Sequence, residues 1–226
     1  MRTFNIPPKY LHKSNFCDIE NPEITQLAQK LTESIPENEK EQQAIRLFYY
    51  VRDQIKYVAM GDRKYYSRKN LKASSTLKRG HGYCIQKAVL LVALVRAKGI
   101  PARFHFVDIK NYLTPASFFE RMGRDLFIYH GFTEIFLNGK WIEANVAFDK
   151  DLCIKKGYPI GEFDGKSPCM FSHLDDKGRK FVEYIKDRGT WAEVPYFKII
   201  WTWFIEYLVK NNKKKHNNDQ VTTSKK

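Results

Sequence analysis

A single cysteine, Cys84, stands where its thiol could act as a nucleophile. It ends the glycine-punctuated run RGHGYC and begins the apolar stretch IQKAVLLVALVRAKG, which predicts a buried helix over residues 84–98 with Gly99 as its C-terminal cap. The N–H groups and the macrodipole at a helix N-terminus favour a thiolate. The same helix end could bind a developing oxyanion through the backbone N–H groups of Tyr83 and Cys84. We therefore predict that Cys84 is a nucleophile; the alternative is a buried structural thiol.

His130 and Asn145 could supply the base and the residue that orients it. The stretch FIYHGFTEIFLNGKWIEANVAF alternates in polarity on both sides of Asn138-Gly139, and this dipeptide favours the type I′ turn of a two-residue hairpin. In that register Asn145 lies opposite Phe132, so His130 and Asn145 are diagonal neighbours on one face of the sheet. An imidazole can take the proton of a thiol, and an amide that accepts its other N–H fixes the tautomer and the ring orientation.

Asp149 is the rival to Asn145 as the third member of this site. In the same register it would oppose Ile128, which makes it the other diagonal neighbour of His130 on the same face. We favour Asn145 because we expect the strand to begin near His130. Asp149 would then lie beyond the end of the ladder.

The remaining histidines and cysteines have plainer interpretations. His81 lies in the same tight turn as Cys84 and is expected to point away from it, and His105 is expected to be a structural residue of a strand. Cys169 and His173 are reminiscent of a metal-binding pair, but two further ligands at suitable spacing are missing from the sequence around them. No acidic loop has the pattern of a calcium site. We therefore predict neither a metal ion nor a cofactor.

Periodicity assigns the elements that must position these residues. The predicted order is helices over 22–34 and 37–57, an irregular basic loop over 61–80, the helix over 84–98, a strand over 102–109, a short helix over 114–122 and the hairpin over 127–148. Helical periodicity therefore precedes alternating periodicity along the chain.

Three stretches are together similar to one known family. They are LFYYVRDQIKY, STLKRGHGYCIQKAVLLVALVRAKGIPARF and YHGFTEIFLNGKWIEAN, and they span roughly residues 44–149. Their succession resembles the transglutaminase-like superfamily. The resemblance implies an α+β, papain-like fold in which a Cys-bearing helix packs on an antiparallel β-sheet carrying His and Asp or Asn, preceded here by N-terminal helices. It implies that Cys84 is the nucleophile, His130 the base and Asn145 the orienting residue.

The resemblance implies several activities and does not choose between them. The family includes enzymes of transamidation, peptide hydrolysis and removal of glycans from asparagine, and also catalytically silent members. Where many members have Asp followed by Pro, this chain has Asn145-Val146. We predict a cysteine-dependent acyl-transfer enzyme that hydrolyses amide bonds of a peptide or protein, as a protease or amidase, because water is always present and no amine site is recognisable. The alternatives are transglutaminase-type amine transfer and a non-catalytic binding or scaffold protein.

Length and composition set the expected organisation of the chain. Its 226 residues, 43% of them hydrophobic, suit one domain at 1–195, followed by an amphipathic helix at 196–209 and a disordered basic tail at 210–226. The start of the chain lacks the apolar core of a secretory signal, and no apolar run is long enough to span a bilayer. We therefore expect a cytoplasmic protein whose four cysteines are free thiols.

The net charge of +14 favours attraction to acidic substrates or anionic surfaces. Specific nucleic-acid binding is not expected, because the basic loop over 61–80 has tyrosines among its lysines and arginines but no recognisable binding motif. The segment FKIIWTWFIEYLV at 197–209 has a narrow polar stripe and is expected to dock on the core. The alternative is that residues 197–215, which end in a lysine cluster, lie on an anionic membrane surface.

Overall fold

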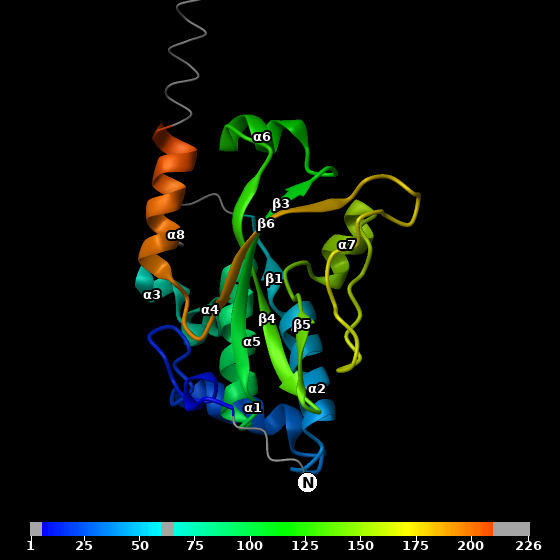
Figure 1. Ribbon diagram of the computed structural model, residues 1–226. Helices are drawn as coiled ribbons and strands as arrows, with labels where there is room; N and C mark the ends of the chain where they lie inside the picture. The colour runs from blue at the N-terminus through cyan, green and yellow to red at the C-terminus, as the bar shows by residue number, and fades with distance from the viewer. Residues whose placement is uncertain (1–5, 60–65, 210–226) are drawn as a thin grey trace, which may run out of the picture.

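The computed structural model describes residues 6–59 and 66–209 (Figure 1). The predicted disordered tail at 210–226 and part of the predicted basic loop, including Tyr65, lie outside the described residues. Within the described part of the chain, no helix has the length and apolarity needed to cross a membrane.

A four-stranded antiparallel sheet with the strand order β5-β4-β3-β6 forms the centre of the molecule. Its strands are β3 (Ala102–Asn111), β4 (Phe127–Leu137), β5 (Lys140–Ala144) and β6 (Val182–Trp191). Two short parallel strands, β1 (Lys56–Tyr57) and β2 (His81–Gly82), form a separate pair. Because β2 ends two residues before Cys84, this pair fixes the approach of the chain to the predicted nucleophile.

Helices cover one side of the sheet and its ends (Figure 1). They are η1 (Pro8–Tyr10), α1 (Pro22–Thr32), α2 (Lys40–Gln54), α3 (Arg68–Leu71), α4 (Ala73–Arg79), α5 (Cys84–Ala97), α6 (Ala116–Met122), α7 (Lys150–Lys156), α8 (Tyr196–Trp203) and η3 (Phe204–Val209). These helices and the antiparallel sheet make the predicted α+β fold, with a Cys-bearing helix packed on the strand that carries His130.

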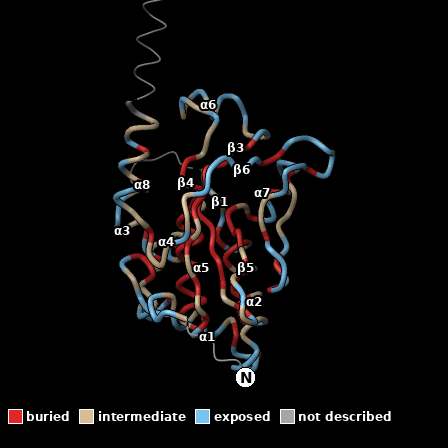
Figure 2. Tube along the Cα trace, in the orientation of Figure 1, coloured by how far each residue is buried: buried red, intermediate tan, exposed pale blue. Residues whose placement is uncertain are grey.

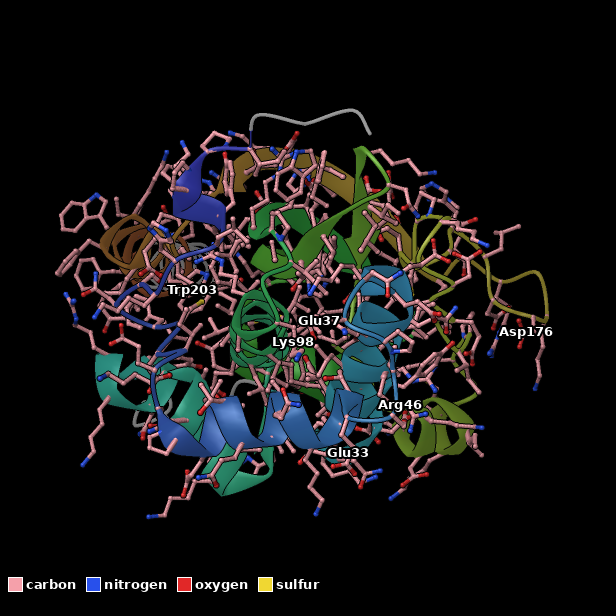
Figure 3. The ribbon with its side chains drawn as sticks, turned by 90° about the horizontal axis from the view of Figure 1, so that it is seen from below. Glu33, Glu37, Arg46, Lys98, Asp176 and Trp203 are labelled. Carbon is pink, nitrogen blue, oxygen red and sulfur yellow. The ribbon has the colours of Figure 1, made fainter. Side chains whose placement is uncertain are left out.

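Helix α5 runs through the middle of the molecule, between the N-terminal helices and the sheet (Figures 1 and 2). Every residue from Ile85 to Arg96 is buried, as expected for a helix that is apolar on nearly all sides. Its C-terminal end is tied to the turn that precedes α2, because Lys98 Nζ lies 3.2 Å from Glu37 Oε2 (Figure 3). The predicted helix and its glycine cap are confirmed: α5 ends at Ala97, and Gly99 has a φ of +68°.

The predicted hairpin is also confirmed, in the predicted register. Leu137 pairs with Lys140, and the pairing continues in step to Thr133 and Ala144. Asn138 and Gly139 have φ values of 51° and 87°, as a type I′ turn requires. One expectation was wrong: β4 begins at Phe127 and not near His130, so its start does not remove Asp149 from the ladder. Instead β5 ends at Ala144, and the chain leaves the ladder before Asn145.

The predicted irregular loop over 61–80 is wrong for residues 68–79, which form α3 and α4. Ser67 caps α3 by accepting the Asn70 N–H, and Gly80 ends α4 in the left-handed region. Leu71 and Thr76 are buried, so tertiary packing stabilises helices whose exposed basic residues gave no helical pattern. The elements α7 and β6 were not predicted either.

The C-terminal helix docks on the core, as expected. Ile199 and Trp203 are buried, and the Trp203 Nε1–H donates to the backbone oxygen of Ile128 over 2.7 Å. The opposite side of the helix exposes Phe197 and Trp201, which are 72% and 65% accessible. Helix α8 therefore packs on the strand that carries His130 and presents aromatic rings to solvent.

Candidate active site

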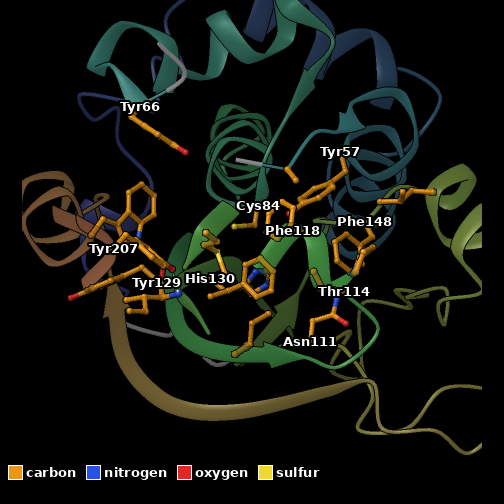
Figure 4. A pocket seen from close by; sticks show the side chains of 18 of the residues that line it. Tyr57, Tyr66, Cys84, Asn111, Thr114, Phe118, Tyr129, His130, Phe148 and Tyr207 are labelled. Carbon is orange, nitrogen blue, oxygen red and sulfur yellow. Dashed lines mark hydrogen bonds between the residues drawn. The ribbon is translucent and has the colours of Figure 1, made fainter. Parts of the chain in front are cut away.

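Cys84 is the first residue of α5 and lines a pocket of about 990 Å³ (Figure 4). The preceding turn depends on two glycines: Gly80 has a φ of +71°, and a Cβ at Gly82 would lie 2.9 Å from Gln86 Cβ. The Tyr83 N–H donates to Gln86 Oε1 over 3.3 Å, which caps the first turn of α5. Of the four cysteines, Cys84 is the one that is half-buried and not fully buried, and it lines the pocket.

The environment of the Cys84 sulfur acts on its pKa in two directions. Burial raises the pKa of the thiol to about 11, although the backbone N–H groups of Gly131, Ile85 and Cys84 itself hydrogen-bond to the sulfur and oppose this. Of the two predicted oxyanion donors, the Tyr83 N–H already has an acceptor in Gln86. The N–H groups directed at the sulfur come from α5 and from Gly131 on β4.

His130 lies on β4 immediately before Gly131, and its ring lines the same pocket as Cys84 (Figure 4). The residue is only 6% exposed. Burial lowers the pKa of His130 to about 4. At neutral pH the site therefore holds a neutral imidazole and a neutral thiol.

Asn145 follows the last residue of β5, and the structure brings it together with His130. The Asn145 Nδ2 atom lies 3.3 Å from His130 Nε2, and the Ala147 N–H donates to Asn145 Oδ1 over 3.1 Å. Because the amide oxygen is engaged by Ala147, the amide NH₂ donates to Nε2, and the ring proton of neutral His130 is on Nδ1. This is the reverse of the predicted arrangement, in which the amide accepts an imidazole N–H.

Asp149, the rival third member, takes part in a different set of contacts. Its carboxylate accepts the Leu152 N–H at the start of α7 over 3.1 Å and the Tyr57 N–H on β1 over 2.8 Å. Lys56 Nζ lies 3.9 Å from the same carboxylate. Asp149 therefore caps α7 and joins it to β1.

An ion pair that sequence reasoning missed holds the backbone just before His130. Tyr129 has a φ of 60°, which is uncommon for a residue other than glycine. Its N–H donates to Asp108 Oδ1 over 3.0 Å, and Asp108 also accepts from Arg188 of β6 over 2.6 Å. Asp108 lies in a stretch of β3 where the register shifts against both neighbouring strands. Such bulges and left-handed residues cluster at functional sites, but no local sequence pattern indicated this one.

Gly131 lets α5 approach β4 closely. A Cβ at this position would lie 2.8 Å from Phe106 Cε1 and 3.2 Å from Ile85 Cγ1. The glycine therefore allows the first turn of α5, with Cys84, to pack directly on the strand that carries His130. The glycine was visible in the sequence, but its role depends on a contact between distant segments.

The other candidate residues have structural contacts elsewhere. His81 is paired with Lys56 in the β1–β2 ladder. His105 lies between Glu134 and Asp187, with ring nitrogens 2.6 Å and 2.9 Å from their carboxylates. The expected structural role of His105 is confirmed.

Cys169 and His173 each have backbone partners in the structure. Cys169 is buried next to β5, where its backbone N–H donates to Glu143, and His173 Nδ1 lies 3.1 Å from the carbonyl oxygen of Val182. Among the described residues, no group of three or more His, Cys, Asp or Glu side chains could hold a metal ion.

The sequence matches the model of one family. The match, to the transglutaminase-like superfamily core, covers residues 25–146, which is more than half of the chain. This protein belongs to the transglutaminase-like superfamily. Its members include cysteine enzymes, and the match contains Cys84, His130 and Asn145.

Two solved structures are similar to this chain but distant in sequence. A "Putative Cysteine Protease" from Cytophaga hutchinsonii is 17% identical with a TM-score of 0.45, over 80% of this chain and 53% of that one. A "Putative Protease" from Parabacteroides distasonis is 12% identical with a TM-score of 0.39, over 58% of this chain and 26% of that one. The chain thus spans about half of the first structure and a quarter of the second. No curated protein matches it.

Proposed function

We propose that this protein is a cysteine-dependent acyl-transfer enzyme that hydrolyses amide bonds of a peptide or protein. The observation that carries the proposal is that Cys84, at the start of α5, and His130, on β4, line one pocket, and that His130 contacts Asn145. Membership of a family of cysteine enzymes supports it.

The proposed reaction has two half-reactions. His130 takes the Cys84 proton as the sulfur attacks the amide carbonyl carbon, and the carbonyl oxygen becomes an oxyanion. The imidazolium then gives this proton to the nitrogen of the leaving amine, the C–N bond breaks, and a thioester with Cys84 remains. Water attacks the thioester with His130 as base, which releases a carboxylic acid and restores the thiol. In this scheme Asn145 is a positioning residue, which holds the ring of His130.

The pocket favours water over an amine as the acceptor. An alkyl ammonium group is held best by carboxylates, and no Asp or Glu is among the described residues that line the pocket.

A second candidate, a binding protein without turnover, is favoured by one observation: burial raises the pKa of Cys84 and lowers that of His130, so the resting pair is neutral.

Thiol chemistry separates the two candidates. Cys84 is the most accessible cysteine, so faster alkylation by iodoacetamide than at the other three would not by itself show activation. The informative comparison is His130→Ala with His173→Ala, a control at an exposed histidine. We expect His130→Ala to slow alkylation of Cys84 at pH 7 on the order of tenfold or more, since general bases commonly contribute at least this much. Equal rates in both variants would favour the binding protein.

Trapping identifies the acyl group directly. The full-length protein is incubated with a peptide library and quenched in acid, and the mass added to the Cys84 peptide is measured. We expect an acyl adduct that is absent from Cys84→Ala. An adduct that forms and is never released as acid, even without added amines, would contradict hydrolysis.

A further inference from the structure

The pocket around Cys84 is enclosed by apolar and aromatic side chains on both sides. On one side lies the α8 wall, which we define as Tyr66, Ile200, Trp203, Phe204 and Tyr207. In Figure 4, Tyr66 and Tyr207 lie to the left of Cys84 and His130. Any group bound to the Cys84 sulfur on this side meets ring faces and aliphatic carbon.

The opposite side is formed by the α7 wall, which we define as Tyr57, Phe148, Leu152 and Tyr158. Tyr57 and Phe148 lie to the right of Cys84 in Figure 4, and their rings pack edge to face with centroids 4.9 Å apart. Cys84 therefore lies between two apolar walls. Both parts of a substrate, on either side of its scissile bond, would contact apolar surface.

Two tyrosines of these walls, Tyr207 and Tyr158, offer their rings and not their hydroxyl groups. The Tyr207 hydroxyl accepts the Ile128 N–H over 2.9 Å and donates to Leu126 O over 3.1 Å. The Tyr158 hydroxyl donates to the backbone oxygen of Leu113 over 3.1 Å. Because backbone groups satisfy these hydroxyls, the aromatic faces of both rings remain as the surface that a substrate can contact.

Among the lining residues that the structure describes, charged side chains are nearly absent. Among the described lining residues the single lysine or arginine is Lys156, which is exposed at the edge of α7, and none is acidic. Moving a carboxylate or an ammonium group from water into such surroundings is costly unless it is paired. The pocket thus disfavours acidic side chains, although the net charge of +14 attracts acidic molecules to the protein as a whole.

We propose that the substrates of this site are peptide segments with bulky apolar side chains next to the scissile amide. The inference rests on the proposed function and names its substrate class. Ligand pockets commonly enclose about 300–1,000 Å³, and this one holds about 990 Å³, which is room for more than one large side chain. Burial of such groups against the two walls supplies the binding energy, and selects against Asp and Glu at these positions.

Peptidyl chloromethyl ketones test this without requiring turnover, because they alkylate the sulfur from the acyl position. The full-length protein is treated with N-capped Leu-Phe and Gly-Asp chloromethyl ketones, and the rate of Cys84 labelling is measured by mass spectrometry. Each rate is divided by the rate with glutathione, which corrects for the intrinsic reactivity of each probe. We expect the Leu-Phe probe to be favoured on the order of tenfold or more, as for other apolar pockets.

Two matched variants locate the preference in the pocket. Phe204→Glu places a carboxylate on the α8 wall, and Phe197→Glu makes the same change on the same helical segment at an exposed ring outside the pocket. Both rings are exposed, 48% and 72%, so neither substitution disturbs the core. We expect the preference for Leu-Phe to fall severalfold in Phe204→Glu and to persist in Phe197→Glu.

The outcomes are distinguishable. Equal corrected rates for the two probes, or faster labelling by Gly-Asp, would overturn the substrate class while Cys84 still reacts. An equal effect of the two glutamate variants would overturn the assignment to the α8 wall. Labelling of Cys84 by either probe no faster than glutathione would overturn the proposed function, and this inference with it.

Discussion

The side-chain amide of Asn145 decides which nitrogen of His130 can act as a base. It donates to Nε2 because its oxygen accepts the Ala147 N–H. The proton of the neutral ring is then on Nδ1, and that nitrogen cannot accept the proton of a thiol. If the amide of Asn145 rotated by about 180°, its oxygen could accept the Nε2–H and leave Nδ1 unprotonated. The hydrogen bond from the Ala147 N–H would then be lost. One backbone N–H, that of Ala147, therefore keeps the resting His130 in the tautomer with the proton on Nδ1, which is the less reactive one.

Replacing Asn145 with Asp should remove this conflict. A carboxylate has acceptors on both oxygens, so it can keep the Ala147 N–H and also accept Nε2–H of His130. Its charge raises the pKa of His130, which burial now holds at about 4. We expect Asn145→Asp to speed the alkylation of Cys84 by iodoacetamide at pH 6–7 severalfold, and to raise the imidazole pKa measured by NMR. Asn145→Ala is the control. If Asp and Ala behave alike, Asn145 does not control the tautomer.

At the scale of elements, the contact between α5 and β4 depends on the missing side chain of Gly131. A methyl group there would lie 2.8 Å from Phe106 and 3.2 Å from Ile85. We expect Gly131→Ala to lower the free energy of unfolding by about 1–3 kcal/mol, as overpacking commonly does, and to slow alkylation of Cys84 by moving α5 away from β4. Urea unfolding and iodoacetamide kinetics measure the two effects. Gly178→Ala is the control for destabilisation without a steric clash, because Gly178 has open space around it but a φ of +73°, so this variant should lose stability and leave the alkylation of Cys84 unchanged.

One result for Gly131→Ala would contradict this prediction. Alkylation that is unchanged in a destabilised variant would show that the spacing between α5 and β4 does not set the reactivity of Cys84.

We also predict that the outer face of α8 contacts anionic membrane surfaces. Phe197 and Trp201 are exposed there, and Arg68 lies 5.4 Å from the Phe197 ring. Aromatic rings beside cations suit a lipid interface. We expect the protein to sediment with phosphatidylserine vesicles, and Trp201→Ser to weaken this severalfold. Leu174→Ser, at an exposed aliphatic residue elsewhere, is the control. Equal binding by the two variants would assign vesicle binding to charge alone.

The elements with a strong local signal could be predicted from the sequence, and those stabilised by distant contacts could not. Asn138-Gly139 was sufficient for the hairpin and its register, and the apolar run after Cys84 was sufficient for α5. In β6 most side chains are exposed or half-buried, so it lacks the alternation that reveals a strand. For the site, the pairing of His130 with Asn145 was accessible through the register, whereas the Asp108–Arg188 ion pair joins residues 80 positions apart.

At the scale of the whole molecule, one buried lysine makes stability depend on pH. Lys87 is fully buried in α5, where its Nζ donates to the backbone oxygen of Arg52 over 3.0 Å. Burial lowers its pKa to about 7 from a usual value of 10.5, although Asp149 and Asp53 oppose this. Between these two values the unfolded chain binds more protons than the folded protein, so folding stability rises with pH.

We therefore expect the contribution of Lys87 to the free energy of unfolding to increase from pH 7 to pH 9 by about 1 kcal/mol per pH unit, measured as the difference between the wild type and Lys87→Met. Urea titrations at fixed temperature measure it. Lys87→Met should flatten the profile in this range, and Lys155→Met, at an exposed lysine, should leave it unchanged. If the difference in unfolding free energy between the wild type and Lys87→Met does not change from pH 7 to pH 9, Lys87 stays charged in the folded protein.

The hydrogen bond from Trp203 to Ile128 makes α8 part of the same functional unit as the strand that carries His130. It joins α8 to β4, the strand that bears His130, and Trp203, Phe204 and Tyr207 form part of one side of the pocket. Recognition by family likeness stops at residue 146. A fragment that ends at residue 146 would contain Cys84, His130 and Asn145 but would lack the α8 residues and Phe148, Leu152 and Tyr158, which form most of both walls of the pocket. The residues after 146 are therefore needed to enclose a substrate.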